Sequence, residues 1–277
     1  HDARSLAQLM IGREMPNVAH AAPRPPGEER LRLNALSHPR ASRFGTTLEG
    51  IDLKLRSGEI VGIAGMSGNG QQELAALISG ETRAQEPGMI EIMGKKVGHL
   101  GPMARRKLGF AFVPEERLGR GAVPEMSLAD NSLLTAHSRS MLSRGFIRRS
   151  VERAFTRECI DAFDVRTPGP DAEAGAMSGG NLQKFILGRE IMLSPDLMLV
   201  SQPTWGVDIG AATAIRRRLL DMRDQGCAIL VISEEMDELF EMCSKLHVLH
   251  KGQLSAALDA ADTTPQEIGS YMIGAVT

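Results

Sequence analysis

Cysteine is scarce in this 277-residue chain, and its three copies lack the spacings that cysteine chemistry uses. Cys159, Cys227 and Cys243 stand in separate segments, and no C-x-x-C pair occurs. Disulfide frameworks and structural zinc sites need paired cysteines at suitable spacings. We therefore expect neither, and we interpret the three thiols as small buried side chains of a protein from a reducing compartment.

Long apolar runs and an excess of one charge are also missing. The longest apolar runs, such as 60–64 and 228–232, are about five residues, whereas a membrane-spanning helix needs roughly 20. The formal net charge is -2, and charged residues make up 24% of the chain. This balance does not predict nucleic acid as a partner. Any link to a membrane is expected to run through a partner protein.

A glycine loop is present at residues 65–72, which read Gly-Met-Ser-Gly-Asn-Gly-Gln-Gln. It follows a stretch, 59–64, that predicts a buried strand, and it precedes a stretch, 72–79, that predicts a helix ended by Gly80. Strand, glycine loop and helix in this order are typical of phosphate-binding loops, whose pattern is G-x-x-x-x-G-K-[ST]. Gln71 and Gln72 replace the lysine and the hydroxyl residue of that pattern.

The backbone of this loop is intact, which leaves two interpretations open. Gly65, Gly68, Asn69 and Gly70 still allow N–H groups and a helix N-terminus to hold a phosphate weakly. The glycines can equally be needed only for the conformation of a strand-to-helix turn. Phe44, upstream of the loop, is expected in the core, with stacking on an adenine as the alternative.

The other segments predict a mixed α/β protein. Prolines at 16, 23, 25 and 26 predict a linker over residues 13–30. Apolar alternation predicts short strands of a small β subdomain, at 31–33, 48–55 and 89–93. Residues 128–193 predict helices, and core strands are predicted at 197–200, 228–232 and 246–249, with a helix at 211–222. Such alternation favours a mostly parallel sheet that binds ligands at the carboxyl ends of its strands.

The two ends of the chain share a pattern. Residues 6–12 match residues 268–274 in apolar pattern, and both contain Met-Ile-Gly. This is expected if the chain opens with the tail of a preceding copy of the domain, although unrelated amphipathic helix ends can also match. We predict that residues 1–28 are that tail and a proline-rich linker, followed by one domain at 29–277. Its β subdomain is expected at about 29–57 and 88–98, and its helical subdomain at about 120–193.

Four motifs carry a resemblance to a known family. Residues 177–184, Met-Ser-Gly-Gly-Asn-Leu-Gln-Lys, closely resemble the signature motif L-S-G-G-N-Q-Q-K of ATP-binding-cassette (ABC) ATPases of the sugar and nucleoside import type. Residues 112–117 resemble the Q-loop, 202–208 the Walker B to D-loop segment, and 232–235 the switch loop. From about residue 29 the chain resembles a P-loop NTPase of this family, which implies a RecA-like core, an antiparallel β subdomain and an α-helical signature subdomain.

The resemblance implies that five positions of this chain's own ATP site have lost their chemistry. Gln71 brings no charge where a lysine gives a contact on the order of 4 kcal/mol at an effective dielectric of about 20. Gln72 and Ser201 stand where a hydroxyl and an aspartate hold Mg²⁺. Gln202 replaces the glutamate that polarises water, a loss of about 10²- to 10⁴-fold. Glu234 replaces a histidine that donates toward phosphate. We expect negligible hydrolysis and no metal ligands here.

The same resemblance implies a site shared between two cassettes. Cassettes of this family meet head to tail, so the signature residues would contact ATP that is bound to the preceding cassette of the same chain. These residues are Ser178, Gly179, Gly180 and Asn181. Mg²⁺ would be held mainly by that other cassette. Glu115 in the Q-loop and Asp208 in the D-loop would also lie beside nucleotide, and Trp205 departs from the arginine usual in the family.

Residues 163–168 and the Gln-Pro-Thr at 202–204 resemble the second cassette of tandem nucleoside-import subunits, with simple-sugar importers close behind. We therefore expect a degenerate second cassette at the cytoplasmic face of a membrane. Its expected partners are transmembrane permease subunits and, indirectly, a substrate-binding protein. Three alternatives stay open: a signature that only caps its helix, a nucleotide-sensing or scaffold module without transport, and an autonomous weak ATPase.

Overall fold

The computed structural model describes residues 27–40 and 42–275. The expected repeat at 6–12 and most of the expected linker lie outside these described residues. Within the described part of the chain, every helix is too short or too polar to cross a bilayer.

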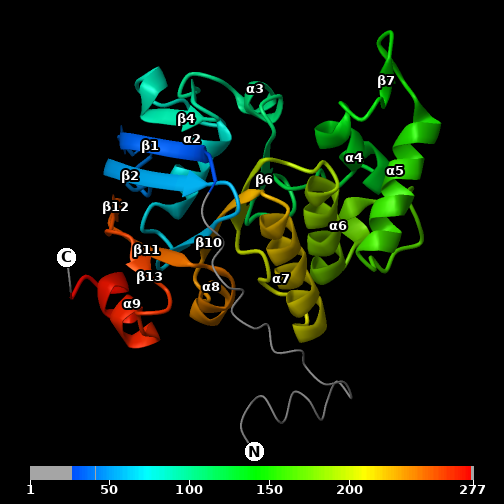
Figure 1. Cartoon of the computed structure of the whole chain (residues 1–277). Helices are drawn as coiled ribbons and strands as arrows, with labels where there is room; N and C mark the ends of the chain where they lie inside the picture. Colours follow the sequence, from blue (N-terminus) through cyan, green and yellow to red (C-terminus); the bar gives the residue numbers. More distant parts are fainter. Residues whose placement is uncertain (1–26, 41, 276–277) are drawn as a thin grey trace, which may run out of the picture.

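A sheet with five parallel strands forms the centre of the domain (Figure 1). Its order is β11-β3-β10-β9-β6, and each neighbouring pair in this run is parallel. The bounds are β3 Ile60–Ala64, β6 Phe110–Val113, β9 Leu197–Ser201, β10 Ala228–Ser233 and β11 Lys245–His250. The short strands β12 Gln253–Leu254 and β13 Leu258–Asp259 pair antiparallel with β11. Residues buried on both faces explain why these strands read as continuous apolar runs.

The antiparallel sheet has the order β2-β1-β4-β5. Its strands are β1 Glu29–His38, β2 Leu48–Arg56, β4 Ile90–Ile92 and β5 Lys95–Lys96, and the 3-10 helix Pro87–Met89 precedes β4. In β2, Ile51, Leu53 and Leu55 are buried and alternate with exposed residues. This alternation places one face of the sheet on a core that it shares with helix α2, Gln71–Ser79.

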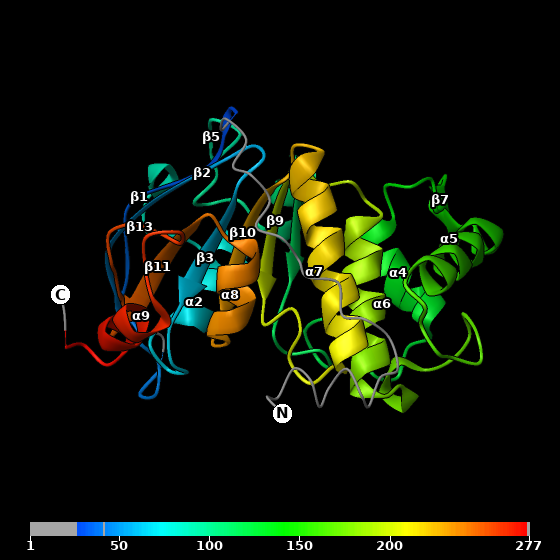
Figure 2. The ribbon, with the colours of Figure 1, turned by 60° about the horizontal axis from the view of Figure 1, so that its bottom comes forward.

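Two cores lie on opposite faces of the parallel sheet, because successive side chains of a strand alternate between its faces. In β10, Ile229 and Val231 belong to one core, whereas Leu230 and Ile232 belong to the other. The first core is covered by α6 Gly179–Ile191, α7 Ile209–Asp224, α8 Met236–Met242 and α9 Pro265–Met272. Figure 2 shows α6, α7 and α8 side by side over this face. The second core contains α2.

Helices α4 Leu128–Ala136 and α5 Arg149–Ala162 pack against α6 at the far side from α9 (Figures 1 and 2). The two-stranded hairpin β7 Leu142–Ser143 and β8 Phe146–Ile147 connects them. The short helix α3 Pro102–Arg106 precedes β6, and the 3-10 helix Ala174–Ala176 precedes α6.

Most predicted elements are confirmed within one or two residues, including the strands at β3, β9, β10 and β11 and the helices α2 and α7. All three cysteines are buried, as expected, and burial raises the pKa of Cys159 and of Cys227 to about 12. The expectation for Phe44 is wrong, because its side chain is 95% exposed and belongs to no core. The elements α3, α8, β6 and the β7–β8 hairpin were not predicted.

Candidate functional site

The five altered positions lie together at the carboxyl ends of the parallel strands. Gln71, Gln72, Ser201, Gln202 and Glu234 line one pocket, together with Ser67, Gly68 and Glu115. The glycine loop follows β3, Ser201 ends β9, and the other residues follow β6, β9 and β10. The pocket has a volume of about 20 Å³, which is room for about one water molecule.

The side chain of Gln71 lies inside the glycine loop. Its Nε2 donates to the carbonyl of Met66 at 2.8 Å, and its Oε1 accepts from the N–H of Asn69 at 3.1 Å. A Cβ atom added to Gly65 would lie only 2.5 Å from the same Nε2, so the amide lies directly against the loop backbone. A backbone donor that a phosphate-binding loop offers to its ligand therefore already has a partner within the chain.

The loop conformation is fixed by several contacts outside its glycines. Gly68 and Gly70 have φ angles of 85° and 112°, in the left-handed region that favours glycine. Asn69 Oδ1 accepts from the N–H of Lys251 at 2.8 Å, and Thr46 Oγ1 donates to the carbonyl of Gly68 at 2.7 Å. These contacts support the conformational role of the glycines.

Negative charge gathers in the pocket. Glu115 is exposed to solvent. Partial burial, and then the nearby carboxylates of Glu234 and Glu116, raise its pKa, while hydrogen bonding to Gln72 and the charge of Arg120 oppose the rise. Arg120 is itself paired with Glu81. No cluster of three or more His, Cys, Asp or Glu side chains suited to a metal ion occurs among residues 27–40 and 42–275. Gln72 and Ser201, at the two positions expected to hold Mg²⁺, bring an amide and a hydroxyl and no carboxylate.

Gln202 and the switch segment are joined by a buried polar network. Gln202 has a φ of 50°, and its Oε1 accepts from the N–H of Glu234 at 3.3 Å. Ser233 Oγ lies 3.3 Å from Gln202 Oε1 and 2.8 Å from Glu238 Oε2. Glu238 is almost fully buried, and burial raises the pKa of its carboxyl. Sequence reasoning missed Glu238, because a single carboxylate in a short amphipathic helix gives no distinct signal.

The signature motif forms the start of helix α6, which is exposed to solvent. Ser178 occupies the N-cap position with φ -64° and ψ 148°, but its side chain makes no capping hydrogen bond to a described residue. Its hydroxyl instead accepts from Asn181 Nδ2 at 2.9 Å, and Asn181 Oδ1 accepts from the N–H of Arg166 at 2.8 Å. Ser178 and Gly179 are exposed, and Gly180 is half-buried. The alternative that this serine only caps its helix has no support in this geometry.

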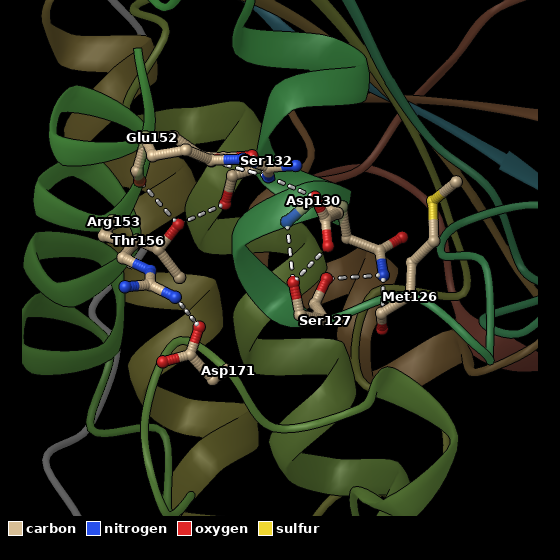
Figure 3. Close-up of polar contacts among 10 residues, drawn as sticks. Met126, Ser127, Asp130, Ser132, Glu152, Arg153, Thr156 and Asp171 are labelled. Atoms are coloured by element: carbon tan, nitrogen blue, oxygen red, sulfur yellow. Dashed lines mark hydrogen bonds and ion pairs between the residues drawn. The ribbon is translucent and has the colours of Figure 1, made fainter. Parts of the chain in front are cut away.

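Helices α4, α7 and α9, unlike α6, have side-chain hydrogen bonds that cap their N-termini. The side chain of Ser127 accepts from the N–H of Asp130 at the start of α4 (Figure 3), and Thr264 forms a capping box with Glu267 at the start of α9. Asp208 accepts from the N–H of Ala211 at 2.9 Å and thereby caps α7. The expected D-loop aspartate thus has a local structural partner, and it is exposed to solvent.

Arg117 joins the signature to the D-loop. It donates through Nε to Gln183 Oε1 at 3.1 Å and through Nη2 to the carbonyl of Trp205. A Cβ on Gly179 would lie 2.7 Å from its guanidinium, and burial lowers its pKa. Trp205 is 56% exposed. Sequence reasoning assigned Arg117 to the Q-loop without a role, because its partners lie more than sixty positions away in the sequence.

The signature and the pocket are separate. None of the residues 178–181 lines the pocket beside the glycine loop. A second cleft, of about 150 Å³, lies between α3, β6 and α4 and is lined by Pro102, Phe112, Pro114, Leu134 and Thr135 among others. The structure thus presents a filled loop, an exposed helix start and a cleft at three different places.

Comparison with known proteins identifies relatives across nearly the whole chain. The pattern of the ABC transporter family matches residues 48–205. The nucleoside import ATP-binding protein NupA of Lactococcus lactis subsp. cremoris is 38% identical over 272 residues, which are 98% of this chain and 53% of that protein. The glucose import ATP-binding protein TsgD13 of Haloferax volcanii is 37% identical and is matched over 97% of this chain and 49% of its own length. The chain thus spans about half the length of these curated relatives.

Solved structures agree on the fold. An ATP-binding subunit of an ABC transporter superposes with a TM-score of 0.70 at 20% identity, over 88% of this chain and 99% of that one. A dimeric ABC cassette, MJ0796 bound to ADP and phosphate, superposes with a TM-score of 0.70 at 20% identity, over 83% and 98% of the two chains.

Proposed function

The chain belongs to the ABC transporter ATPase family, and from this premise we propose that it is the non-hydrolysing cassette of an importer for nucleosides or simple sugars. It supplies its signature motif to ATP held by a second, competent cassette, and it couples closure of that pair to permease subunits. Relatives named for nucleoside, guanosine, glucose and ribose import support this substrate range. Their length, about twice that of this chain, supports a second cassette in the same polypeptide.

The contrast between two helix N-termini carries the proposal. At α2 the loop is occupied by Gln71, and the surrounding pocket holds Glu115 and Glu234. At α6 the start of the helix is exposed, and Ser178 leaves the first-turn N–H groups without a side-chain cap from the described residues. A helix N-terminus with free N–H groups attracts anions. The chain is therefore suited to reach a phosphate held by a partner and unsuited to hold one itself.

The signature residues have distinct tasks in this proposal. The Ser178 hydroxyl, held by Asn181, donates to a phosphate oxygen of the partner's ATP. Gly179 and Gly180 bring backbone N–H groups close to that phosphate, since they have no side chains to obstruct the approach. Mg²⁺ and the attacking water belong to the competent cassette, because Gln72, Ser201 and Gln202 offer neither a hard carboxylate ligand nor a base.

The cleft between α3, β6 and α4 is the proposed contact with the permease. It lies beside the Q-loop, which follows β6, and its apolar lining includes Phe112 and Leu134. Because α4 also packs against α6, movement of a segment bound in this cleft is transmitted toward the signature helix. In this proposal the domain lies at the cytoplasmic face of the membrane that contains the permease.

The test compares one change at each helix N-terminus in the assembled importer. Ser178→Arg fills the space for the partner's phosphate and is expected to abolish ATP hydrolysis and uptake. Gln71→Ala is expected to leave both nearly unchanged. Equal effects of the two changes would refute the proposed division of labour.

A control addresses the autonomous ATPase. Hydrolysis by this chain alone, above background and abolished by Gly70→Asp, would establish that alternative, because the aspartate obstructs only the loop of this chain.

A further inference from the structure

The hairpin β7–β8, between α4 and α5, exposes an unusual combination of side chains. Nine consecutive residues, 142–150, are exposed. Phe146 is 78% exposed, Leu142 46% and Ile147 39%. Figure 1 shows the hairpin projecting beyond the neighbouring helices at the upper edge of the domain. Three large apolar side chains on so small a projection indicate a surface that meets an apolar environment.

These apolar side chains are not needed to fold the hairpin. Met141, immediately before β7, is completely buried and forms a small core with Ala136 and Phe155. The N–H of Arg148 donates to the carbonyl of Met141 at 2.7 Å and closes the base of the hairpin. Phe146 lies outside that core, so its exposure is not explained by a structural requirement of this domain.

The charge of the same segment is strongly positive. Residues 131–151 contain Arg139, Arg144, Arg148 and Arg149 and no aspartate or glutamate. Arg149 is paired with Asp130 and Glu152. Arg139 and Arg144 have no side-chain partner within the described part of the chain, and Arg148 reaches only the carbonyl of Ser140, at 3.4 Å. Three guanidinium groups around the exposed apolar tip therefore lack a counter-ion.

The hairpin stands on a rigid base. Thr156 of α5 donates to Ser132 of α4 at 2.9 Å, and both side chains are buried (Figure 3). Arg149 bridges Asp130 of α4 and Glu152 of α5, whose side chain is fully buried. The tip is therefore carried by two helices that are fixed to each other.

We infer that the β7–β8 hairpin binds the surface of an anionic membrane, with Phe146 in the interface and Arg139, Arg144 and Arg148 among the lipid headgroups. An apolar tip surrounded by unpaired arginines matches a surface with an apolar interior and anionic headgroups. The orientation rests on the proposed function: α4 supplies Leu134 and Thr135 to the cleft proposed for the permease, and the hairpin projects at the same edge of the domain (Figure 1).

Vesicle binding by the purified chain tests this inference without a permease. The chain is expected to sediment with vesicles of phosphatidylglycerol and phosphatidylcholine but not with phosphatidylcholine alone, and salt should weaken the binding. Arg144→Glu with Arg148→Glu should reduce the partition coefficient by more than about fivefold per charge. Arg217→Glu, at an exposed arginine of α7, and Ile273→Ser, at an exposed apolar residue after α9, are the matched controls.

Fluorescence locates the tip. In the variant Phe146→Trp, the fluorescence of the new tryptophan should shift to the blue on anionic vesicles and should be quenched by brominated acyl chains. The emission of Trp205, measured in the unmodified chain, should not change. Absence of vesicle binding, or equal loss in the Arg217 and Ile273 controls, overturns the inference. A second outcome would also overturn it: a hairpin variant binds vesicles normally but no longer binds a permease that is embedded in neutral lipid. The hairpin would then contact the permease protein and not the membrane. Ser178→Arg should leave vesicle binding intact, so failure of the proposed function would be recognised separately.

Discussion

Helices α2 and α6 both begin after a glycine-containing turn, yet their N-termini are in opposite conditions. The loop before α2 is occupied by the amide of Gln71, which uses the N–H of Asn69 and the carbonyl of Met66. The start of α6 is exposed, and the Ser178 side chain is held beside it by Asn181 without capping it. An N-terminus can thus keep its anion-binding backbone and still lose its ligand site to one neighbouring side chain.

Charge deepens the difference between the two sites. Glu115 and Glu234 line the pocket beside α2, whereas the start of α6 lies near the guanidinium of Arg117. The two carboxylates oppose phosphate at the first site, where the only cation of the lining, Arg120, is paired with Glu81, whereas a guanidinium favours an anion at the second. Electrostatics and hydrogen bonding therefore act in the same direction at each site.

The largest expected effect comes from removing the Ser178 hydroxyl. Ser178→Ala should reduce ATP hydrolysis by the assembled importer by roughly tenfold to a hundredfold, which corresponds to about 1.5–3 kcal/mol for a hydrogen bond to a charged group. Thermal unfolding of the chain should hardly change, because the serine does not cap α6. Ser127→Ala is the matched control: it removes a real cap of α4 and should cost about 1 kcal/mol of stability. A comparable loss of stability in both variants would show that Ser178 is a structural cap after all.

A smaller effect is expected from emptying the loop before α2. Gln71→Ala leaves the N–H of Asn69 with only the carbonyl of Met66, at 3.3 Å, as acceptor, so affinity of the isolated chain for ATP, measured by calorimetry, should rise by up to about fivefold, the equivalent of one ordinary hydrogen bond. Stability should fall by about 1 kcal/mol, since two hydrogen bonds are lost. Gln72→Ala, at the neighbouring position, should produce no such gain. An unchanged affinity in Gln71→Ala would mean that the amide does not block the loop.

The smallest effect concerns the pH dependence of the acidic pocket. The pKa of Glu115 is raised above its ordinary 4.5 by burial and by Glu234. Its contribution to stability is therefore fully present below the unfolded pKa and is lost as the pH rises through the folded pKa. Glu234→Gln should lower the pKa of Glu115, detectable by carboxyl NMR titration, and should reduce the loss of melting temperature between acidic and neutral pH. If the Glu234→Gln variant and the unmodified protein show the same pH profile, Glu234 has no effect on the pKa of Glu115.

The parallel strands could be predicted from the sequence because burial on both faces leaves continuous apolar runs. The stretches 197–200 and 228–232 are such runs, and they became β9 and β10 nearly unchanged. Strand β6 was missed because its last two residues, Phe112 and Val113, were interpreted as the start of the Q-loop, although all four of its residues are buried. The strands β7 and β8 have two residues each, too few for any periodicity.

Side-chain placement could not be predicted to the same degree. Grouping Gln71, Ser201, Gln202 and Glu234 around one pocket follows from strand order, because the carboxyl ends of parallel strands meet at one edge. Whether Gln71 points toward a ligand or back into its own loop depends on rotamers and on the carbonyl of Met66, which no motif encodes. Phe44 was misjudged for a related reason, since an aromatic residue in a loop gives no periodicity that would identify its environment.

The guanidinium of Arg117 links the signature to the D-loop. One planar cation, already hydrogen-bonded to Gln183 and to the carbonyl of Trp205, presses against Gly179. Separating these segments would break both bonds, so the signature and the D-loop are coupled through this side chain. In the proposed pair of cassettes, these two loops would therefore reach the partner together, in one concerted step in place of two successive dockings.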